Sequence, residues 1–365
     1  MKRFNVGIVG CGNISGIYQK NIIERFSKQL NLIACTDLIA SRAEDFAARY
    51  PGIKALTPEE FYVNPDIEIV VNLTTPQSHF IVAKSALENG KHVYSEKPLS
   101  LSRTDAALLL KIAKERNLRV ANAPDTILGA GHQTCRKLID SGAIGTPVSA
   151  TAFLQGHGHE SWHPDPEFYY LFGAGPMLDM GPYYVTALVN MLGPVSRVTG
   201  SARISFPTRT ITSEKKNGKV IPVEVPTHIS GILDFANGAI GTIITSFDVW
   251  SHTLPCIEIH GSKGSLSVPD PNNFGGEVKL WTTDKREWTT VEHTHPYPEN
   301  SRGLGVADLA ASIEAGIPHT ATGELANHVL DIMFGIHDAS EQGKHINLAS
   351  SCARPVPQPE KSRWE

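Results

Sequence analysis

Cysteine is scarce in this sequence. The 365 residues include five cysteines, which are widely spaced and form no Cys-x-x-Cys pair. An odd number of cysteines at such spacings argues against a disulfide framework and against a zinc knuckle. We expect most of these thiols to be small, buried hydrophobic side chains.

Long hydrophobic runs and an excess of basic charge are also missing. No apolar run approaches the roughly 18 residues of a membrane span, and the first predicted strand begins without a preceding signal-peptide segment. The net charge of −4 gives no reason to expect nucleic acid or an anionic membrane as a partner. We therefore expect a cytoplasmic protein with neither partner.

The length and composition predict two globular domains. Hydrophobic residues make up 41% of the chain and charged residues 19%, and 365 residues are too many for one ordinary core. We find no internal repeat. The predicted division is a dinucleotide-binding domain over residues 1–124, a substrate-binding and oligomerisation domain over 125–353, and a Pro-rich tail over 354–365.

A glycine-rich turn follows the first apolar run. Phe4 to Val9 predicts a buried strand, and Gly10-x-Gly12-x-x-Ser15 predicts a tight turn into a helix. Gly10 permits the turn, Gly12 lets the backbone approach a phosphate, and the helix N-terminus supplies positive potential. Ser15 stands where a third Gly or Ala is usual. The pattern is typical of a pyrophosphate site, although an ordinary glycine turn gives a similar string.

An acidic residue follows the second apolar run. Residues 30–36 are followed by Asp37, which places a carboxylate where it can accept both hydroxyls of an adenosine ribose. This arrangement favours NAD. Arg42 offers an alternative, because a guanidinium there can hold the 2′-phosphate of NADP.

Strand and helix patterns alternate through the first third of the chain, which predicts a doubly wound parallel sheet of six strands. The apolar runs that predict strands, besides the first two, are Ile67–Leu73, His92–Ser95 and Leu118–Ala121, and the predicted helices are Ile39–Tyr50, Gln77–Asn89 and Thr104–Glu115. Ligands of such sheets bind at the carboxyl ends of the strands. The Gly10 turn, Thr74-Thr75-Pro76 with His79, and Glu96-Lys97-Pro98 all fall at that edge.

After about residue 145 the pattern predicts an α+β domain with a large, open, mostly antiparallel sheet. The strand-like segments are 146–154, 197–204, 229–235, 239–249, 257–260, 278–282 and 288–292, and Asn237-Gly238 is a hairpin signal. Met177–Leu192, Leu304–Ala315 and Gly323–Gln342 are the predicted helices. Alternation in 229–235 and 239–249 leaves an apolar face that predicts a homodimer or homotetramer, and we expect the substrate between the two domains.

Glu96-Lys97-Pro98 is the segment where we expect chemistry. Pro98 restricts Lys97, so the amine is held at a strand end beside the expected nicotinamide, where it can help to remove a hydroxyl proton. The alternative is a surface Glu-Lys pair before a helix.

Residues 156–164 are rich in histidine. His157, His159, Trp162 and His163 suit a sugar, because aromatic faces pack on its C–H groups and imidazoles hydrogen-bond its hydroxyls. Two alternatives are a metal site made of His159, Glu160 and His163, and a solvated loop with Trp162 as a core plug. We favour substrate contact and expect no metal.

The chain resembles the Gfo/Idh/MocA family of nicotinamide-dependent sugar and polyol oxidoreductases. The resemblance covers nearly the whole length and rests on Gly10-Cys11-Gly12-Asn13-Ile14, Thr74-Thr75-Pro76 with His79, Glu96-Lys97-Pro98, Gly173-x-Gly175-x-x-x-Asp179-x-Gly181 and His260-Gly-x-x-Gly264. It implies an N-terminal Rossmann domain and a homo-oligomer. The cofactor-binding residues that we predict are Gly10, Gly12, Asn13, Ile14, Asp37, Arg42, Thr74, Pro76, His79, Glu96 and Lys97. The resemblance also implies a catalytic group of Lys97, Asp179 and the residue four positions after Asp179, all of which also contact substrate.

That last residue is Tyr183, where the family usually has histidine. We expect Asp179 and Tyr183 to lie one turn apart on one helix, 177–192. Tyr183 accepts the hydroxyl proton if a neighbouring ammonium such as Lys97 favours its phenolate. Alternatively Tyr183 only packs, and Lys97 or a loop histidine accepts the proton.

Two classes of function follow. The first is an NAD-dependent dehydrogenase acting on a sugar, a polyol or a sugar derivative. The second is a protein of the same fold without net redox turnover, either a glycosidase that recycles its NAD or a nucleotide-sensing regulator. Lys97 and Asp179 favour chemistry, because a sensor needs neither.

Overall fold

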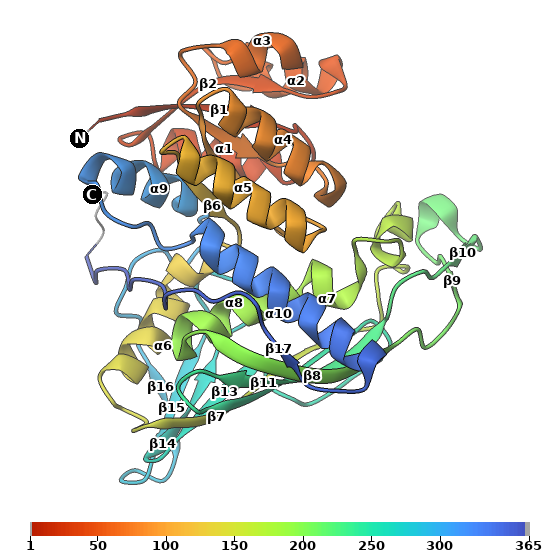
Figure 1. Cartoon of the computed structure of the whole chain (residues 1–365), viewed down its shortest axis with the longest axis vertical. Helices are drawn as coiled ribbons and strands as arrows, with labels where there is room; N and C mark the ends of the chain where they lie inside the picture. Colours follow the sequence, from red (N-terminus) through yellow and green to blue (C-terminus); the bar gives the residue numbers. More distant parts are fainter. Residues whose placement is uncertain (1, 362–365) are drawn as a thin grey trace. The chain divides into compact units, whose positions relative to one another are not determined.

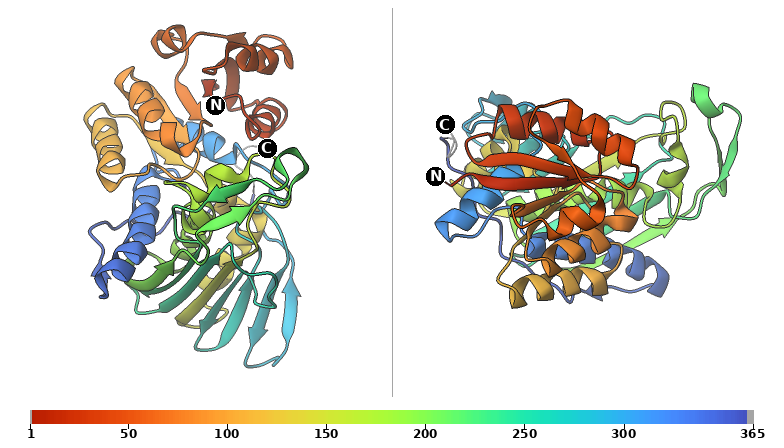
Figure 2. Two further views of the ribbon diagram at one scale, coloured as in Figure 1. Left: turned by 90° about the vertical axis from the view of Figure 1, so that its right-hand side faces the viewer. Right: turned by 90° about the horizontal axis from the view of Figure 1, so that it is seen from above.

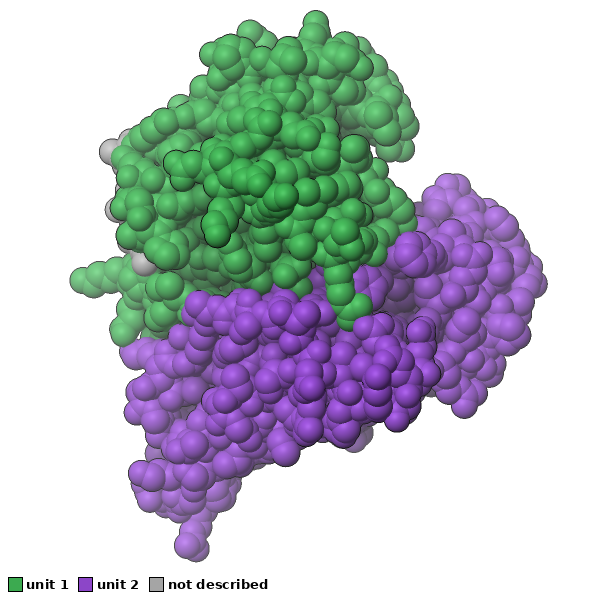
Figure 3. Space-filling model, in the orientation of Figure 1, with its two compact units in different colours: residues 1–133, 294–327, 355–365 green, residues 134–293, 328–354 purple. Residues whose placement is uncertain are grey.

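The computed structural model describes residues 2–361. The chain forms two compact units, coloured separately in Figure 3. Unit 1 consists of Met1–Gln133, Thr294–Asn327 and Pro355–Glu365, and unit 2 of Thr134–His293 and His328–Arg354. The predicted division into independent domains, with boundaries at residues 124 and 353, stays a prediction.

Unit 1 is built on a parallel sheet of six strands in the order β3-β2-β1-β4-β5-β6. The strands are β1 Phe4–Val9, β2 Leu30–Thr36, β3 Lys54–Ala55, β4 Ile69–Asn72, β5 His92–Ser95 and β6 Val120–Asn122. Helices α1 Ser15–Glu24, α2 Ala40–Ala48, α3 Pro58–Val63, α4 Pro76–Glu88 and α5 Arg103–Glu115 connect them (Figure 1). The predicted doubly wound sheet is confirmed. The sequence patterns assigned no range to β3, a two-residue edge strand without apolar character.

A helix from late in the chain completes unit 1. α9 spans Leu304–Ala315 and begins beside the end of β6. One carboxylate oxygen of the buried Asp125 accepts hydrogen bonds from the backbone N–H groups of Gly303, at 2.9 Å, and Gly305, at 3.0 Å. A Cβ at Gly305 would lie 2.6 Å from the ring of Tyr94, so this close packing requires glycine.

Unit 2 is built on a nine-stranded sheet in the order β16-β15-β14-β13-β7-β12-β11-β8-β17. Its strands are β7 Pro147–Gln155, β8 Val195–Arg203, β11 His228–Phe235, β12 Ile240–Ser246, β13 Ile257–Gly261, β14 Gly264–Val268, β15 Val278–Thr282, β16 Trp288–Val291 and β17 Ile346–Asn347 (Figure 2). Every neighbouring pair is antiparallel except β7 and β12. The mostly antiparallel sheet is therefore confirmed.

Helices cover one face of this sheet. All residues of α8, Gly181–Leu192, are buried, and Ile336 of α10, Gly323–Gln342, lies against Gly200 and Gly231 of β8 and β11. Along β11 the residues alternate between fully buried and half-buried. The half-buried set, which includes Ile232, points to the opposite face, so that face is incompletely covered in the single chain.

The predicted single helix over residues 177–192 is wrong. The chain forms α7, Gly175–Asp179, and then α8, with Met180 between them. Pro182 explains the break, because it has no N–H to donate and its ring collides with a preceding helical turn. Asp179 therefore ends one helix, whereas Tyr183 lies in the first turn of the next.

The remaining elements of the second part of the chain are short. They are α6 Ala130–Asp140, η1 Thr126–Leu128, η2 Pro166–Tyr170, η3 Glu214–Lys216, and a separate ribbon of β9 Thr208–Thr210 and β10 Val220–Pro222. No helix within residues 2–361 is long and apolar enough to cross a membrane.

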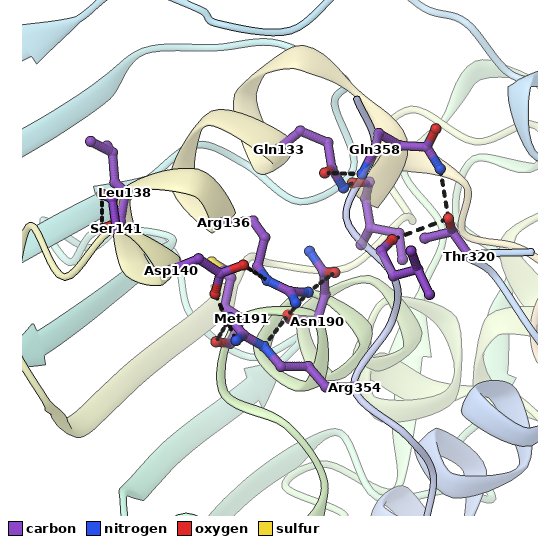
Figure 4. Close-up of polar contacts among 12 residues, drawn as sticks. Gln133, Arg136, Leu138, Asp140, Ser141, Asn190, Met191, Thr320, Arg354 and Gln358 are labelled. Atoms are coloured by element: carbon purple, nitrogen blue, oxygen red, sulfur yellow. Dashed lines mark hydrogen bonds and ion pairs between the residues drawn. The ribbon is translucent and has the colours of Figure 1, made fainter. Parts of the chain in front are cut away.

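The start of the predicted tail is anchored in unit 2 (Figure 4). Asp140 receives Arg136 Nε on one oxygen and Arg354 Nη1 on the other, both at 2.7 Å. Arg354 Nε also donates to the backbone carbonyl of Asn190, at the C-terminal part of α8. Arg354 is thus an ordered part of the packing of unit 2.

Candidate cofactor site and candidate catalytic residues

The glycine-rich turn has the shape that a pyrophosphate site needs. Gly10 has φ +93°, and a Cβ there would lie 2.8 Å from the backbone of Leu73. Around Gly12 the situation is the opposite, because no atom lies within 4 Å of the position of a Cβ. Gly10 is therefore required by the fold, whereas Gly12 leaves open space over the turn for a ligand.

The helix that follows the turn has backbone donors available at its N-terminus. Ile14 occupies the N-cap of α1 and has no polar side-chain atom to satisfy them. Ser15 replaces the third glycine, and its hydroxyl donates to the carbonyl of Gly12 at 2.6 Å. The residues of the turn therefore fit the diphosphate of a dinucleotide.

Asp37 lies directly after β2, next to the turn. Its Oδ2 accepts the N–H of Cys11 at 2.8 Å, and its Oδ1 accepts the N–H of Ile39 at 2.9 Å. A carboxylate has about four acceptor positions, so the half-buried Asp37 retains capacity for ribose hydroxyls. Arg42 is exposed on α2. The choice between NAD and NADP that these two residues imply stays a prediction.

Two buried asparagines hold the carboxyl ends of β4, β5 and β6. Asn72 Nδ2 donates to Ser95 Oγ, and its Oδ1 accepts the hydroxyl of Thr74 at 2.6 Å. Asn122 Nδ2 donates to the carbonyls of Ser95 and Glu96. Our sequence analysis missed both asparagines, although a polar residue that ends a buried apolar run is a signal for such a role.

His79 links two of the predicted loops. Its side chain is completely buried, and its ring nitrogens lie 2.7 Å from the carbonyl of Pro98 and 3.0 Å from that of Thr74. Burial lowers the pKa of His79. The imidazole therefore fixes the Thr74–Pro76 loop against the Lys97-Pro98 loop, and direct contact with the cofactor stays a prediction.

The carboxylate of Glu96 is clamped within unit 1. The hydroxyl of Tyr18, on α1, donates to Glu96 Oε1 at 2.8 Å, and the backbone N–H of Lys97 donates to Oε2 at 3.2 Å. The Lys97-Pro98 peptide is cis, and the Lys97 side chain is half-buried. Tyr18, which belongs to no sequence motif, thus connects the helix of the cofactor turn to the predicted catalytic segment.

In unit 2, two predicted site residues lie side by side. His159 Nε2 is 3.7 Å from Asp179 Oδ2, and their side chains are 13% and 19% exposed. The imidazole stacks on Tyr169 with 3.6 Å between ring centroids and an angle of 6° between the planes. This arrangement presents an imidazole and a carboxylate together to solvent.

The other loop residues form aromatic contacts. His157 stacks on Trp250, with 3.3 Å between centroids, and burial lowers the pKa of His157. Trp162 contacts His163 edge-on and is 62% exposed. The alternative in which Trp162 is a core plug is therefore wrong.

Glu160 has a partner in the β9–β10 region. Arg209 Nη1 lies 3.1 Å from Glu160 Oε1, and Arg209 also pairs with Asp248. All three side chains are more than nine-tenths buried. The carboxylate of Glu160 is thus part of a structural ion network, which does not suit the alternative of a metal site with His159 and His163. Among residues 2–361, no group of three or more His, Cys, Asp or Glu side chains could hold a metal ion.

Tyr183 is 8% exposed, and its backbone N–H bonds to the carbonyl of Met180. Its neighbour Tyr184 is 3% exposed, and burial raises the pKa of Tyr184. The assignments of Lys97, Asp179 and Tyr183 as catalytic residues stay predictions.

These features define a dinucleotide-binding protein. The glycine turn, the acid after β2 and the strand order 3-2-1-4-5-6 are those of a dinucleotide-binding Rossmann fold. The sequence model of the oxidoreductase family with an NAD-binding Rossmann fold matches residues 4–123, and that of the GFO/IDH/MocA C-terminal domain matches residues 132–267. The chain belongs to the Gfo/Idh/MocA family and is an NAD-binding oxidoreductase, as the resemblance predicted.

Known relatives cover most of the chain. It is 29% identical to dTDP-3,4-didehydro-2,6-dideoxy-alpha-D-glucose 3-reductase from Saccharopolyspora spinosa, over 86% of this chain and 96% of the relative. It is 25% identical to levoglucosan dehydrogenase from Pseudarthrobacter phenanthrenivorans, over 82% and 83%. A solved structure of levoglucosan dehydrogenase in complex with NADH has a TM-score of 0.81 at 20% identity and covers 96% of this chain and all of that chain, which shows a shared fold.

Proposed function

We propose that this protein is an NAD-dependent dehydrogenase that transfers hydride between the nicotinamide and a CH–OH carbon of a sugar, a polyol or a sugar derivative. The surface of loop 156–172 carries the proposal. It combines the exposed Trp162 with stacked imidazoles, and the carboxylate of Asp179, at the end of α7, lies beside the imidazole of His159. Such surfaces suit sugars, because ring C–H groups pack on aromatics and hydroxyls need hydrogen bonds. The names of two relatives, a levoglucosan dehydrogenase and a deoxysugar reductase, point to the same class.

The residues of unit 1 would hold the cofactor. The turn at Gly10 and Gly12 and the first N–H groups of α1 would bind the pyrophosphate, and Asp37 would bind the adenosine ribose. Bound NAD supplies the hydride acceptor or donor. Thr74, Pro76 and Glu96 would border the nicotinamide half, held in place by Asn72, Asn122 and His79.

The residues that handle the substrate hydroxyl are part of the same proposal. Lys97 orients the reacting hydroxyl and stabilises negative charge on its oxygen. Asp179 accepts a hydrogen bond from the substrate. The proton passes either to Tyr183, at the position of the usual family histidine, or to an imidazole of loop 156–172.

Two alternatives keep the fold but give no net redox product. A glycosidase that recycles its NAD would release a free sugar, and a nucleotide sensor would bind cofactor without turnover. Lys97 and Asp179 favour a catalyst over a sensor.

A cofactor-reduction screen tests the proposal. The protein is incubated with NAD or NADP and a panel of sugars, anhydrosugars and polyols, and reduced nicotinamide is followed by absorbance. We expect reduction with NAD and at least one member of the panel. Release of sugar from a glycoside without net reduction would instead show the glycosidase, and tight NAD binding without any product would show the sensor.

The proposal also includes assembly and location. We propose a homodimer or homotetramer that uses the incompletely covered face of the nine-stranded sheet, and a cytoplasmic location.

A further inference from the structure

The spacing of His159 and Asp179 suits a hydroxyl group between them. Their 3.7 Å separation is longer than the 2.7–3.2 Å of an ordinary hydrogen bond. A hydroxyl there can donate its one proton to His159 Nε2, while Asp179 Oδ2 accepts from a neighbouring hydroxyl of the same substrate. Because both side chains are partly exposed, a ligand can reach that position.

We propose that His159 is the catalytic base of this enzyme and that Asp179 accepts a hydrogen bond from a neighbouring hydroxyl of the same substrate. The inference rests on the proposed dehydrogenase function and assigns the proton acceptor that the function left open. It moves the acceptor from Tyr183 on α8 to an imidazole on the loop after β7.

The plane of the His159 ring is fixed by aromatic contacts. Tyr169 stacks on one face at 3.6 Å, and Phe247 contacts the ring edge-on with centroids 4.7 Å apart. Phe247 belongs to the buried cluster of Tyr170, Ile211 and Ile221, and Tyr169 packs against that cluster. The two rings that contact His159 are therefore supported by the core. A base held in one orientation needs less reorganisation during the reaction.

The backbone around His159 is fixed as well. Gly158 has φ +74°, and a Cβ there would collide with the carboxylate of Glu160 and the hydroxyl of Tyr170, each at 2.2 Å. The carbonyl of Glu160 accepts the N–H groups of Thr212, at 3.0 Å, and Ser213, at 2.8 Å. Together with the Glu160–Arg209 ion pair, these contacts hold the residues on both sides of His159.

The two possible acceptors differ in intrinsic chemistry. A tyrosine, with an ordinary pKa of about 10, needs strong help to ionise near neutral pH, whereas a histidine, at about 6.5, is already neutral and basic there. Tyr183 is also nearly buried, at 8% exposure. The intrinsic chemistry therefore favours His159 as the proton acceptor.

The substrate O–H bond breaks and its proton moves to the His159 imidazole, while the C–H bond breaks and its electron pair moves with the hydrogen to the nicotinamide of NAD. A carbonyl forms at that carbon. The imidazolium then releases its proton to solvent, and in the reverse direction it donates the proton to the new alkoxide.

Chemical rescue tests the assignment. The experiment compares the full-length wild type, His159→Gly, Tyr183→Phe and His345→Gly, an exposed histidine of unit 2 far along the chain, using the best substrate from the screen. We expect His159→Gly to lose about 10²- to 10⁴-fold in kcat and to keep its NADH affinity in a fluorescence titration. Added imidazole should restore turnover, and more basic methylimidazoles should restore more. His345→Gly should remain close to wild type, and Tyr183→Phe tests the competing assignment of the proton acceptor.

Each other outcome is decisive. Near-normal kcat in His159→Gly would overturn the assignment, and so would lost activity without rescue in a protein that still binds NADH. Loss of turnover in Tyr183→Phe alone would return the acceptor role to Tyr183. If the wild type reduces NAD with no member of the panel, the proposed function fails and this inference fails with it, which is distinct from failure of His159 alone.

Discussion

The backbone N–H of Cys11 donates a 2.8 Å hydrogen bond to the carboxylate of Asp37. The bond ties the middle of the glycine-rich turn to the end of β2. The carboxylate that we expect to select the ribose therefore also shapes the pyrophosphate turn. For this reason the effect of an Asp37 substitution has to be measured with both NADH and NADPH.

We predict that Asp37→Ala weakens NADH binding by about 10- to 100-fold relative to NADPH. The reason is loss of the charge-assisted hydrogen bond to the ribose 2′-hydroxyl, which NADPH does not have and which contributes about 1.5–3 kcal/mol. Fluorescence titration of both cofactors measures the change. Damage to the turn alone would weaken both equally, and tighter NADPH than NADH binding in the wild type would instead assign selectivity to Arg42.

Lys97→Ala should remove most of the turnover, by about 10²- to 10⁴-fold in kcat, because the reacting hydroxyl loses its orienting ammonium. NADH affinity should change little. Lys84→Ala, which removes a half-buried lysine paired with Glu88 on α4, is the control and should leave kcat near wild type. Steady-state kinetics with the substrate from the screen decides, and an unchanged kcat would place Lys97 outside the mechanism.

Asp125 should make stability depend on pH. Burial raises its pKa to about 6 from 3.8, although the Gly303 and Gly305 N–H groups partly oppose the shift. Because the folded-state pKa is the higher one, this contribution to stability is complete below pH 3.8 and is lost as the pH rises through about 6. The loss is at most about 3 kcal/mol, at 1.36 kcal/mol per pH unit.

Asp125→Asn isolates that contribution, because the amide oxygen can still accept both glycine N–H groups. Urea denaturation from pH 4 to pH 7 measures the difference between wild type and variant. The difference should change in favour of the variant as the pH rises. A constant difference would show that Asp125 does not titrate in this range.

Arg209→Met should destabilise unit 2 by about 3–5 kcal/mol, because the carboxylates of Glu160 and Asp248 would stay buried without their counter-charge. Thermal or urea unfolding measures this loss. The matched control is Arg197→Met, which removes the more exposed ion pair with Asp234 and should cost no more than about 1 kcal/mol. Equal losses in the two variants would argue against a special role for the buried network.

Light scattering should show a dimer or tetramer at micromolar concentration. Ile232→Asp, on the incompletely covered face of the sheet, should shift the mass toward the monomer, since a charge there would be buried in the contact. Val63→Asp, at an exposed site on α3, should leave the mass unchanged. A monomeric wild type would contradict the proposal.

Local patterns were sufficient for most of the framework. Four elements occur with the predicted bounds, because their periodicity and flanking residues specify each element locally. They are His92–Ser95, Val278–Thr282, Leu304–Ala315 and Gly323–Gln342. Pro182 is a sequence signal for a helix break, but the apolar run around it predicts one continuous helix. Strand β14 and helix α6 were not predicted. For β14 the reason is that Gly264–Val268 alternates small residues with few large apolar ones, which is a weak strand pattern.

The site was harder to predict, because its contacts join distant segments. Glu160 and Arg209 are separated by 49 residues in sequence, and nothing in either local pattern shows that they pair. The same holds for Tyr18 and Glu96, whose hydrogen bond spans 78 residues. The sequence therefore indicated which residue types carry the chemistry, while the partners that orient them, such as Tyr169 beside His159, required the fold.

The late return of the chain to unit 1 has a consequence for biosynthesis. All six strands of the parallel sheet have been synthesised by residue 122, but Gly303, which donates a hydrogen bond to Asp125, is synthesised 178 residues after Asp125. At about 5–20 residues per second, that interval is on the order of 10–40 s. During translation the carboxylate of Asp125 therefore stays exposed to water until the segment around Gly303 has been made. If the ribosome stalls before residue 303, the packing of the parallel sheet against α9 cannot form.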